Sequence, residues 1–261
     1  MSVDSSTGRD RQAPTSTSPI CRLCKSELAI ENSHVIPAFV FKWLKETSAT
    51  GRLRYGERPN VPVQDGEKLP LLGASCEQRF SRWEGAFSEQ LFQLLVTEAP
   101  PPHPHGEWLA PFAASVCWRA VQSLREKGVL DDLTELDNLA LAAAELEWAS
   151  IALGNTPASM QYPVRLMCLG KIEDAENLEL SVYTNTYFCR TIQLDFISNA
   201  LESAVFAKLG PALFLGSVRV HSEDMWLGTK IELEEGQIAV PPVRAPLPLM
   251  EYLMEQADRV G

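Results

Sequence analysis

Three cysteines in the first third of the chain have the types and spacing of a metal site. Cys21 and Cys24 form a C-x-x-C pair, in which two thiolates from one tight turn can bind the same zinc ion. Cys76 is the natural third ligand, and a second such turn would place a fourth cysteine three residues earlier, where the chain has Gly73. A redox C-x-x-C lies at a strand-to-helix junction. This pair instead lies between polar turns near the start of the folded part, so the sequence favours a structural zinc site.

The sequence leaves the fourth zinc ligand open between His34, Cys117 and a water molecule. If His34 bound the zinc ion, it could not also act as a general base. Cys117, Cys168 and Cys189 lie in apolar segments, which is typical of buried core cysteines.

Residues 20–90 resemble the zinc-stabilised members of the HNH endonuclease superfamily, the ββα-metal nucleases. The resemblance rests on C-R-L-C at residues 21–24, N-S-H-V-I-P at 32–37 and L-L-G-A-S-C-E-Q-R-F-S at 71–81. The longer phrase S-H-V-I-P-A-F-V-F-K-W-L-K is similar to a bacterial subgroup of such proteins, several of which act in anti-phage defence. The resemblance therefore implies a zinc-stabilised ββα unit over about a third of the chain.

The resemblance also implies a mechanism and roles for particular residues. His34 matches the general base that activates a water molecule for attack on a phosphodiester, and Pro37 matches the family proline. A catalytic Mg²⁺ or Mn²⁺ would stabilise the developing charge. Where the family has an acidic residue or histidine before the base this chain has Ser33, so Glu77 or Glu84 would supply the carboxylate ligands. The family asparagine that orients the base has no counterpart here, and the nearest polar candidates are Asp65 and Glu67.

Basic side chains gather around these motifs. They are Lys42, Lys45, Arg52, Arg54 and Arg58 before the third cysteine, and Arg79 and Arg82 after it. Such residues beside a nuclease site would contact phosphates, and a solvated basic face is the alternative.

The net charge of −11 is unevenly distributed along the chain. Residues 1–90 contain 12 Lys and Arg against 11 Asp and Glu, whereas residues 91–261 contain 11 against 23. The acidity therefore argues against nucleic-acid binding only for the C-terminal part, which suits a protein partner better.

Hydrophobic periodicity predicts an α+β protein in three parts. Residues 1–19 read as a disordered tail, residues 20–98 as the HNH-like domain and residues 107–261 as an α+β domain of unknown role, separated by the Pro-rich run 99–108. We expect helices at 38–46, 78–97, 110–127 and 131–153, then a mostly β part from residue 162 and a short helix at the C-terminus. Residues 195–210 fit either a strand or a helix with a period of four.

Two functions follow as hypotheses. The first is a metal-dependent nuclease, or nuclease-like subunit, acting on DNA or RNA. The second is a catalytically silent zinc module that binds a protein or a nucleic acid. No apolar run approaches the ~20 residues that a membrane span needs, and the N-terminus lacks the apolar region of a signal peptide. Six cysteines without such a signal indicate a reducing compartment, so we expect a cytoplasmic protein.

Overall fold

The structure is a computed structural model with a mixed α and β architecture. It describes residues 19–30, 32–55, 58–99, 103–156, 161–170, 184–220, 236–238 and 247–259. The predicted tail is described only at its last residue, 19, and much of the predicted β part, including residues 171–183 and 221–235, lies outside the described residues. Within the described part, no helix is both long enough and apolar enough to cross a membrane.

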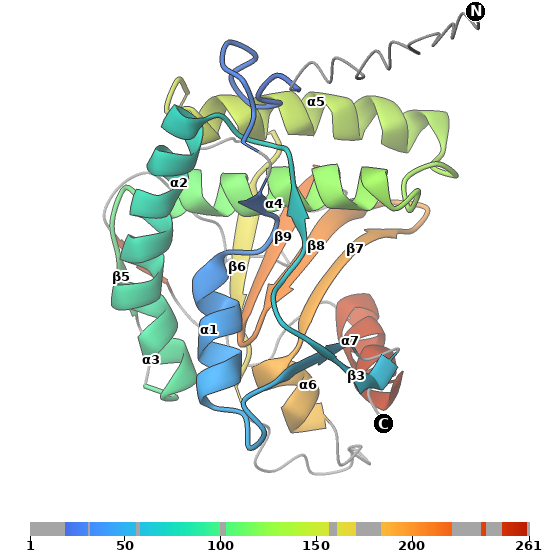
Figure 1. Cartoon of the computed structure of the whole chain (residues 1–261). Coiled ribbons are helices and arrows are strands. Elements are labelled where there is room, and N and C mark those ends of the chain that lie inside the picture. The colour runs from blue at the N-terminus through green and yellow to red at the C-terminus, as the bar shows by residue number, and fades with distance from the viewer. Residues whose placement is uncertain are drawn as a thin grey trace, which may run out of the picture.

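A four-stranded antiparallel sheet forms the centre of the molecule (Figure 1). Its strands are β6 (Val164–Cys168), β7 (Ile192–Ser198), β8 (Ser203–Leu209) and β9 (Ala212–Arg219), in the order β6-β9-β8-β7. The stretch 195–210 is therefore two strands and not a helix. They are joined by a turn in which Asn199 Oδ1 accepts the backbone N–H groups of Leu201 and Glu202.

The two faces of the sheet contribute to two hydrophobic clusters, because side chains alternate along each strand. Val205, Ala207 and Leu209 belong to the larger cluster, and Phe206 between them belongs to the smaller one. The smaller cluster also contains buried side chains of α7 (Leu247–Arg259), the predicted C-terminal helix. The larger cluster contains the side chains of α4 and of the N-terminal elements.

Two long helices cover the larger cluster. Helix α4 (Leu109–Glu126) crosses the sheet, and α5 (Glu135–Ala152) packs along α4 (Figure 1). The second helix begins at residue 135 and not at 131 because Thr134 caps it, accepting the backbone N–H of Asp137 at 3.1 Å.

The N-terminal elements follow the order β, α, β, β, β, α. Their bounds are β1 (Ser33–His34), α1 (Ala38–Glu46), β2 (Leu53–Tyr55), β3 (Arg58–Val63), β4 (Lys68–Leu69) and α2 (Ala74–Phe87). Strand β1 pairs with β4 in antiparallel register, so His34 lies opposite Lys68. Helix α2 continues through a π-helical turn, η1 (Ser88–Phe92), into α3 (Gln93–Val96), and together they replace the single helix predicted at 78–97.

One prediction of local structure was wrong. The segment Tyr187–Arg190 reads as strand because of its aromatic residues, but it lies in helix α6 (Thr184–Arg190). The helix is favoured because it buries Tyr187 and Phe188 side by side in the smaller cluster.

The Pro-rich run that the sequence marks as a boundary joins two parts that share one core. It contains the short strand β5 (His103–His105), which pairs with β10 (Gly236–Ile238). Phe87 of α2 stacks on Phe112 of α4 at 4.4 Å between ring centroids, and both rings lie 5.7 Å from Phe214 of β9. The N-terminal elements are therefore packed against the sheet and not held apart by a linker.

Candidate functional site

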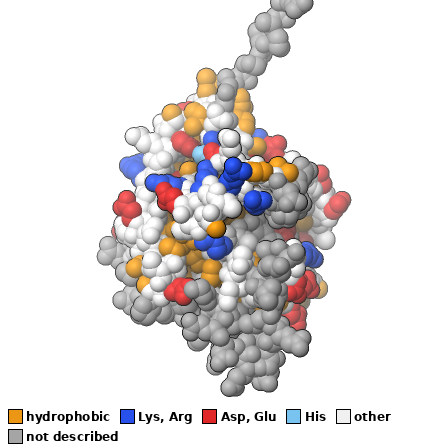
Figure 2. All heavy atoms as spheres, turned by 60° about the horizontal axis from the view of Figure 1, so that its bottom comes forward, with side chains coloured by type: hydrophobic (Ala, Val, Ile, Leu, Met, Phe, Trp, Pro, Cys, Tyr) orange, Lys and Arg blue, Asp and Glu red, His pale blue; other side chains and the backbone are white. Residues whose placement is uncertain are grey.

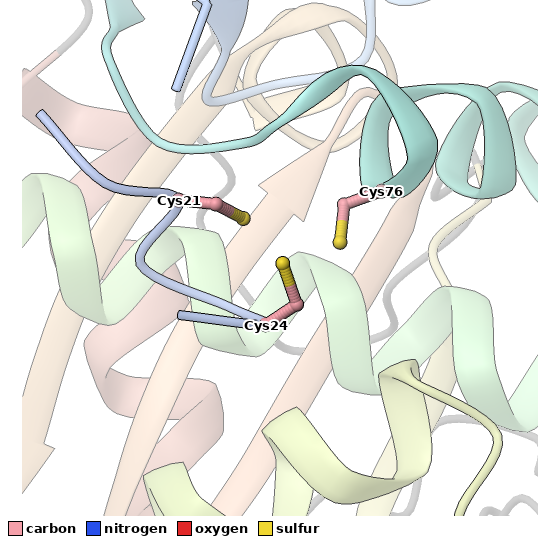
Figure 3. Close-up of side chains that lie close together, drawn as sticks. All are labelled: Cys21, Cys24 and Cys76. Atoms are coloured by element: carbon pink, nitrogen blue, oxygen red, sulfur yellow. The ribbon is translucent and has the colours of Figure 1, made fainter. Parts of the chain in front are cut away.

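The three predicted zinc ligands lie together. The thiol groups of Cys21, Cys24 and Cys76 are all within 4.8 Å of one another, and all three cysteines are free. Their sulfur atoms point toward a common centre (Figure 3). Cys21 and Cys24 come from a tight turn closed by the bond from Lys25 N–H to the Cys21 carbonyl at 3.0 Å, and Cys76 lies in the first turn of α2. This arrangement can hold a metal ion.

The thiols of the cluster differ in acidity. Burial raises the pKa of Cys76, and the neighbouring Cys21 and Cys24 add to this effect. Burial also acts to raise the pKa of Cys24, but hydrogen bonds from Ser26 outweigh it and lower the value to about 7. Because metal-bound cysteines are thiolates, metal binding at this cluster must release protons.

The fourth position of the cluster is shaped by Gly73 and Glu27. Gly73 is the N-cap of α2, and a side chain there would meet the Glu27 carboxylate. Two of the predicted fourth ligands lie elsewhere. Among the described residues, neither His34 nor Cys117 belongs to the cluster, and the Cys117 sulfur packs against Gly216 in the core.

We expect that Cys76→Ser abolishes stoichiometric zinc binding and lowers the melting temperature. With zinc at about 1,000 times its Kd, a bound ion stabilises the folded state by about 4 kcal/mol, which corresponds to roughly 8–16 °C in a chain of this size. Atomic absorption and thermal unfolding with and without a chelator measure the two effects. Cys189→Ser is the matched control, since Cys189 lies in α6 outside the cluster. A wild-type melting temperature that a chelator does not change would contradict a structural metal.

His34 is hydrogen-bonded to an acidic residue. Both oxygens of Asp65 lie 3.2 Å from His34 Nε2, and Lys68 Nζ lies 2.7 Å from the same carboxylate. The bond from Lys68 contributes most to lowering the pKa of Asp65 to about 2, and Gly66 N–H and His34 add to it against the effect of burial. An ionised carboxylate only accepts hydrogen bonds, so Nε2 carries the proton and Nδ1 holds the lone pair. Asp65, one of the two polar candidates, is thus the one that hydrogen-bonds to His34.

The two predicted carboxylate ligands have different surroundings. Glu84 Oε1 accepts a hydrogen bond from Arg119 Nη1 at 2.7 Å, and the Arg119 side chain is only 2% exposed. Arg119 Nη1 also donates to the His34 carbonyl at 3.3 Å. Glu77 is half-buried and, among the described residues, has no ion pair within bonding distance. Burial raises the pKa of Glu77, with Glu84 adding to this effect and Arg119 and Ser33 opposing it.

Ser33, which precedes His34, is fully buried, and its hydroxyl accepts the Leu72 backbone N–H at 3.2 Å. Ser33, His34 and Arg119 all lie close enough to Glu77 to oppose the rise in its pKa. Sequence reasoning missed Arg119, although it is a lone basic residue within the apolar run of α4.

The predicted phosphate-binding residues divide into two groups. The side chains of Lys42, Arg52, Arg54 and Arg82 are exposed and that of Lys45 is partly exposed. Arg79 instead donates to the Leu153 carbonyl at the end of α5, which gives it a structural role. The side chain of Arg58 lies outside the described residues. Figure 2 shows basic side chains in the middle of the face that forms the bottom of Figure 1, with acidic ones mostly toward its edge.

Comparison with family models, with curated proteins and with solved structures finds no match for this chain. The described residues contain two groups that could do chemistry. One is the three-cysteine cluster, whose Cys76 lies in α2, and the other is the pair of His34 on β1 and Asp65 in the loop before β4.

Proposed function

We propose that the chain is an HNH-like nuclease whose structural zinc ion is bound by the cysteine cluster. The observation that carries this proposal is the pair His34–Asp65. His34 lies on β1, which pairs with β4, and helix α2 after β4 carries both Cys76 and Glu77. The resemblance implies a paired β–β unit followed by a helix, with the base on the first strand; here α1, β2 and β3 are inserted between the two paired strands.

His34 has the features of a general base in this proposal. Asp65 fixes the ring through Nε2, so Nδ1 is the atom that would take a proton from water. The described residues place no hydrogen-bond partner on Nδ1, which leaves it available to a substrate or a water molecule. Lys68, which pairs with Oδ2 of Asp65, would add a positive charge that attracts a phosphate.

Glu77 is the residue that would hold a catalytic Mg²⁺ or Mn²⁺. Mg²⁺ is often bound through one or two carboxylates together with substrate phosphates, so a single carboxylate is a sufficient protein ligand. When bound, the ion would stabilise the charge that develops on the phosphate. Glu84 is less suited to this role, because the Arg119 guanidinium already occupies its carboxylate.

The same guanidinium favours a second candidate, a catalytically silent zinc module that binds a protein or nucleic-acid partner. Arg119 places a permanent positive charge between Glu84 and the His34 carbonyl, close enough to Glu77 to oppose the rise in its pKa that burial causes. A charge in this position competes with a divalent ion for the same carboxylates. In a binding module, His34, Asp65 and Lys68 would serve structure only.

A cleavage assay on the full chain distinguishes the two candidates. Supercoiled DNA, single-stranded DNA and RNA are incubated with the protein in Mg²⁺, in Mn²⁺ and with neither ion; no chelator is added, because it would also strip zinc. We expect cleavage that requires the divalent ion and that falls by about 10- to 100-fold in Glu77→Gln. Glu89→Gln, an exposed residue of η1, is the matched control.

One outcome would contradict the role of Glu77, and another would contradict nuclease activity itself. Cleavage that is equal in Glu77→Gln and wild type would remove Glu77 from the mechanism. Failure of the wild-type protein to cut any of the three substrates would leave the silent module, and binding of the same nucleic acids would then be measured.

A further inference from the structure

We propose that Glu27 is the fourth ligand of the zinc ion, in place of the cysteine that a second C-x-x-C turn would have at residue 73. The inference rests on the zinc-binding part of the proposed function and does not depend on nuclease activity. It assigns a Cys₃Glu ligand set to the cluster of Cys21, Cys24 and Cys76.

The Glu27 side chain fills the space beside Gly73. A Cβ atom built on Gly73 would lie 2.5 Å from Glu27 Oε2 and 2.7 Å from Glu27 Cβ, so the two positions cannot both carry side chains without a shift. Gly73 itself has an ordinary extended backbone, with φ at −79°, so no strain requires glycine there. The Glu27 side chain therefore occupies the space that a side chain at residue 73 would need.

The backbone around Glu27 belongs to the same turn as the cysteines. The Glu27 carbonyl accepts the Cys21 N–H at 2.7 Å, which closes the loop that carries Cys24. Glu27 Oε2 accepts the Ser75 N–H at 3.1 Å, one residue before Cys76. The carboxylate thus bridges the two segments that supply the three thiols.

The carboxylate is adjacent to the cluster but does not yet complete it. Among the described residues, the group whose ligand atoms all lie within 4.8 Å contains the three cysteines alone. The Ser75 N–H holds Glu27 Oε2 in this structure, so coordination needs a turn of a partly exposed side chain. The turn would exchange the bond from the Ser75 N–H for the metal, and carboxylate oxygen is an accepted zinc ligand at about 2.0–2.2 Å.

Three variants test the assignment. Glu27→Ala removes both the ligand and the acceptor for Ser75 N–H. Glu27→Gln keeps an acceptor for that amide but lacks the anionic oxygen. The double variant Glu27→Gly with Gly73→Cys offers a fourth thiolate in the space that Glu27 vacates, because glycine also removes the Cβ atom that would lie 2.7 Å from a Cβ at residue 73. Glu46→Gln on α1 is the control, since Glu46 is exposed and lies outside the cluster.

Zinc affinity by chelator competition and the spectrum of the cobalt-substituted full chain are the readouts. We expect Glu27→Ala and Glu27→Gln to weaken zinc binding on the order of 10- to 100-fold and to shift the visible cobalt bands, with unchanged thiolate-to-cobalt intensity. The double variant should recover the affinity, and its thiolate-to-cobalt intensity should rise by about one third as a fourth sulfur joins three.

The assignment is overturned if Glu27→Gln keeps both the affinity and the cobalt spectrum of wild type. A capping role alone would show as a lower stability of the metal-free Glu27→Ala variant with unchanged zinc affinity, which also overturns it. A wild-type chain that binds no zinc removes the metal site and Glu27 with it, whereas loss of nuclease activity alone leaves both intact.

Discussion

His34→Ala is expected to lower the rate of nucleic-acid cleavage by about 10²- to 10⁴-fold while the bound zinc stays at the wild-type level. The loss of rate follows because His34 is the group proposed to take the proton from the attacking water. Zinc is retained because His34 lies outside the cysteine cluster. Initial cleavage rates and zinc content measured on the same preparation test both halves of the prediction.

Asp65→Asn should give a smaller loss of rate than His34→Ala. An asparagine can present either its oxygen or its NH₂ group to Nε2, so the ring is no longer held in the tautomer that leaves Nδ1 free. His105→Ala on β5 is the control for a histidine outside the site. A His34→Ala protein that cleaves at the wild-type rate would show that another group acts as the base.

Arg119→Met is expected to destabilise the protein by about 3–5 kcal/mol. The change removes the partner of Glu84 and leaves a carboxylate that is only 20% exposed without its counter-charge. It also removes hydrogen bonds to the His34 carbonyl and to Ser115, and the contact of the guanidinium with the Phe80 ring at 5.1 Å. Denaturant unfolding with the metal bound measures the free energy.

Two further variants separate the charge from the packing. Arg125→Met, on the same helix, removes a half-exposed arginine from Glu145, which keeps its hydrogen bond from Gln122, and should cost less than Arg119→Met. Adding Glu84→Gln to Arg119→Met should restore part of the lost stability, because the unpaired charge is then gone. If Arg119→Met is as stable as wild type, the Glu84 ion pair does not hold α2 against α4.

Patterns in the sequence were enough to predict the cysteine cluster and the helix at 38–46. The helix depends on the apolar face of α1 and the first two ligands on a single turn, whereas Cys76, far along the chain, was assigned as the third thiol that a zinc site needs. The apolar residues of β9 likewise predicted a strand, whereas the stretch that contains β8 fitted either a strand or a helix.

The apolar face of the helix at 78–97 was predicted only in part. The periodicity placed Leu91, Leu94 and Leu95 on the buried face, but Phe92 is fully buried and Leu94 is not. The π-helical turn η1 adds a residue to one turn and rotates the face that follows it. A regular period of 3.6 cannot indicate such a change, because it arises where Phe92 meets Phe39 and Trp43 of α1.

The surroundings of the histidine could not be predicted because they depend on distant segments. Arg119 reaches His34 and Glu84 from α4, and Asp65 reaches His34 from the loop before β4. No local motif links these positions. The Gly73 position was recognised from the sequence as lacking a ligand, but the Glu27 carboxylate beside it appears only once the turn is folded.

The core that joins the N-terminal elements to the sheet has a consequence for synthesis on the ribosome. Cys21 and Cys76 leave the ribosome well before Phe214, which packs against Phe87 and Phe112 in the same core. Until then the nascent chain carries three reduced thiols on a half-built core, a state open to oxidation and to aggregation. Zinc captured during translation would protect these thiols before the sheet closes behind them.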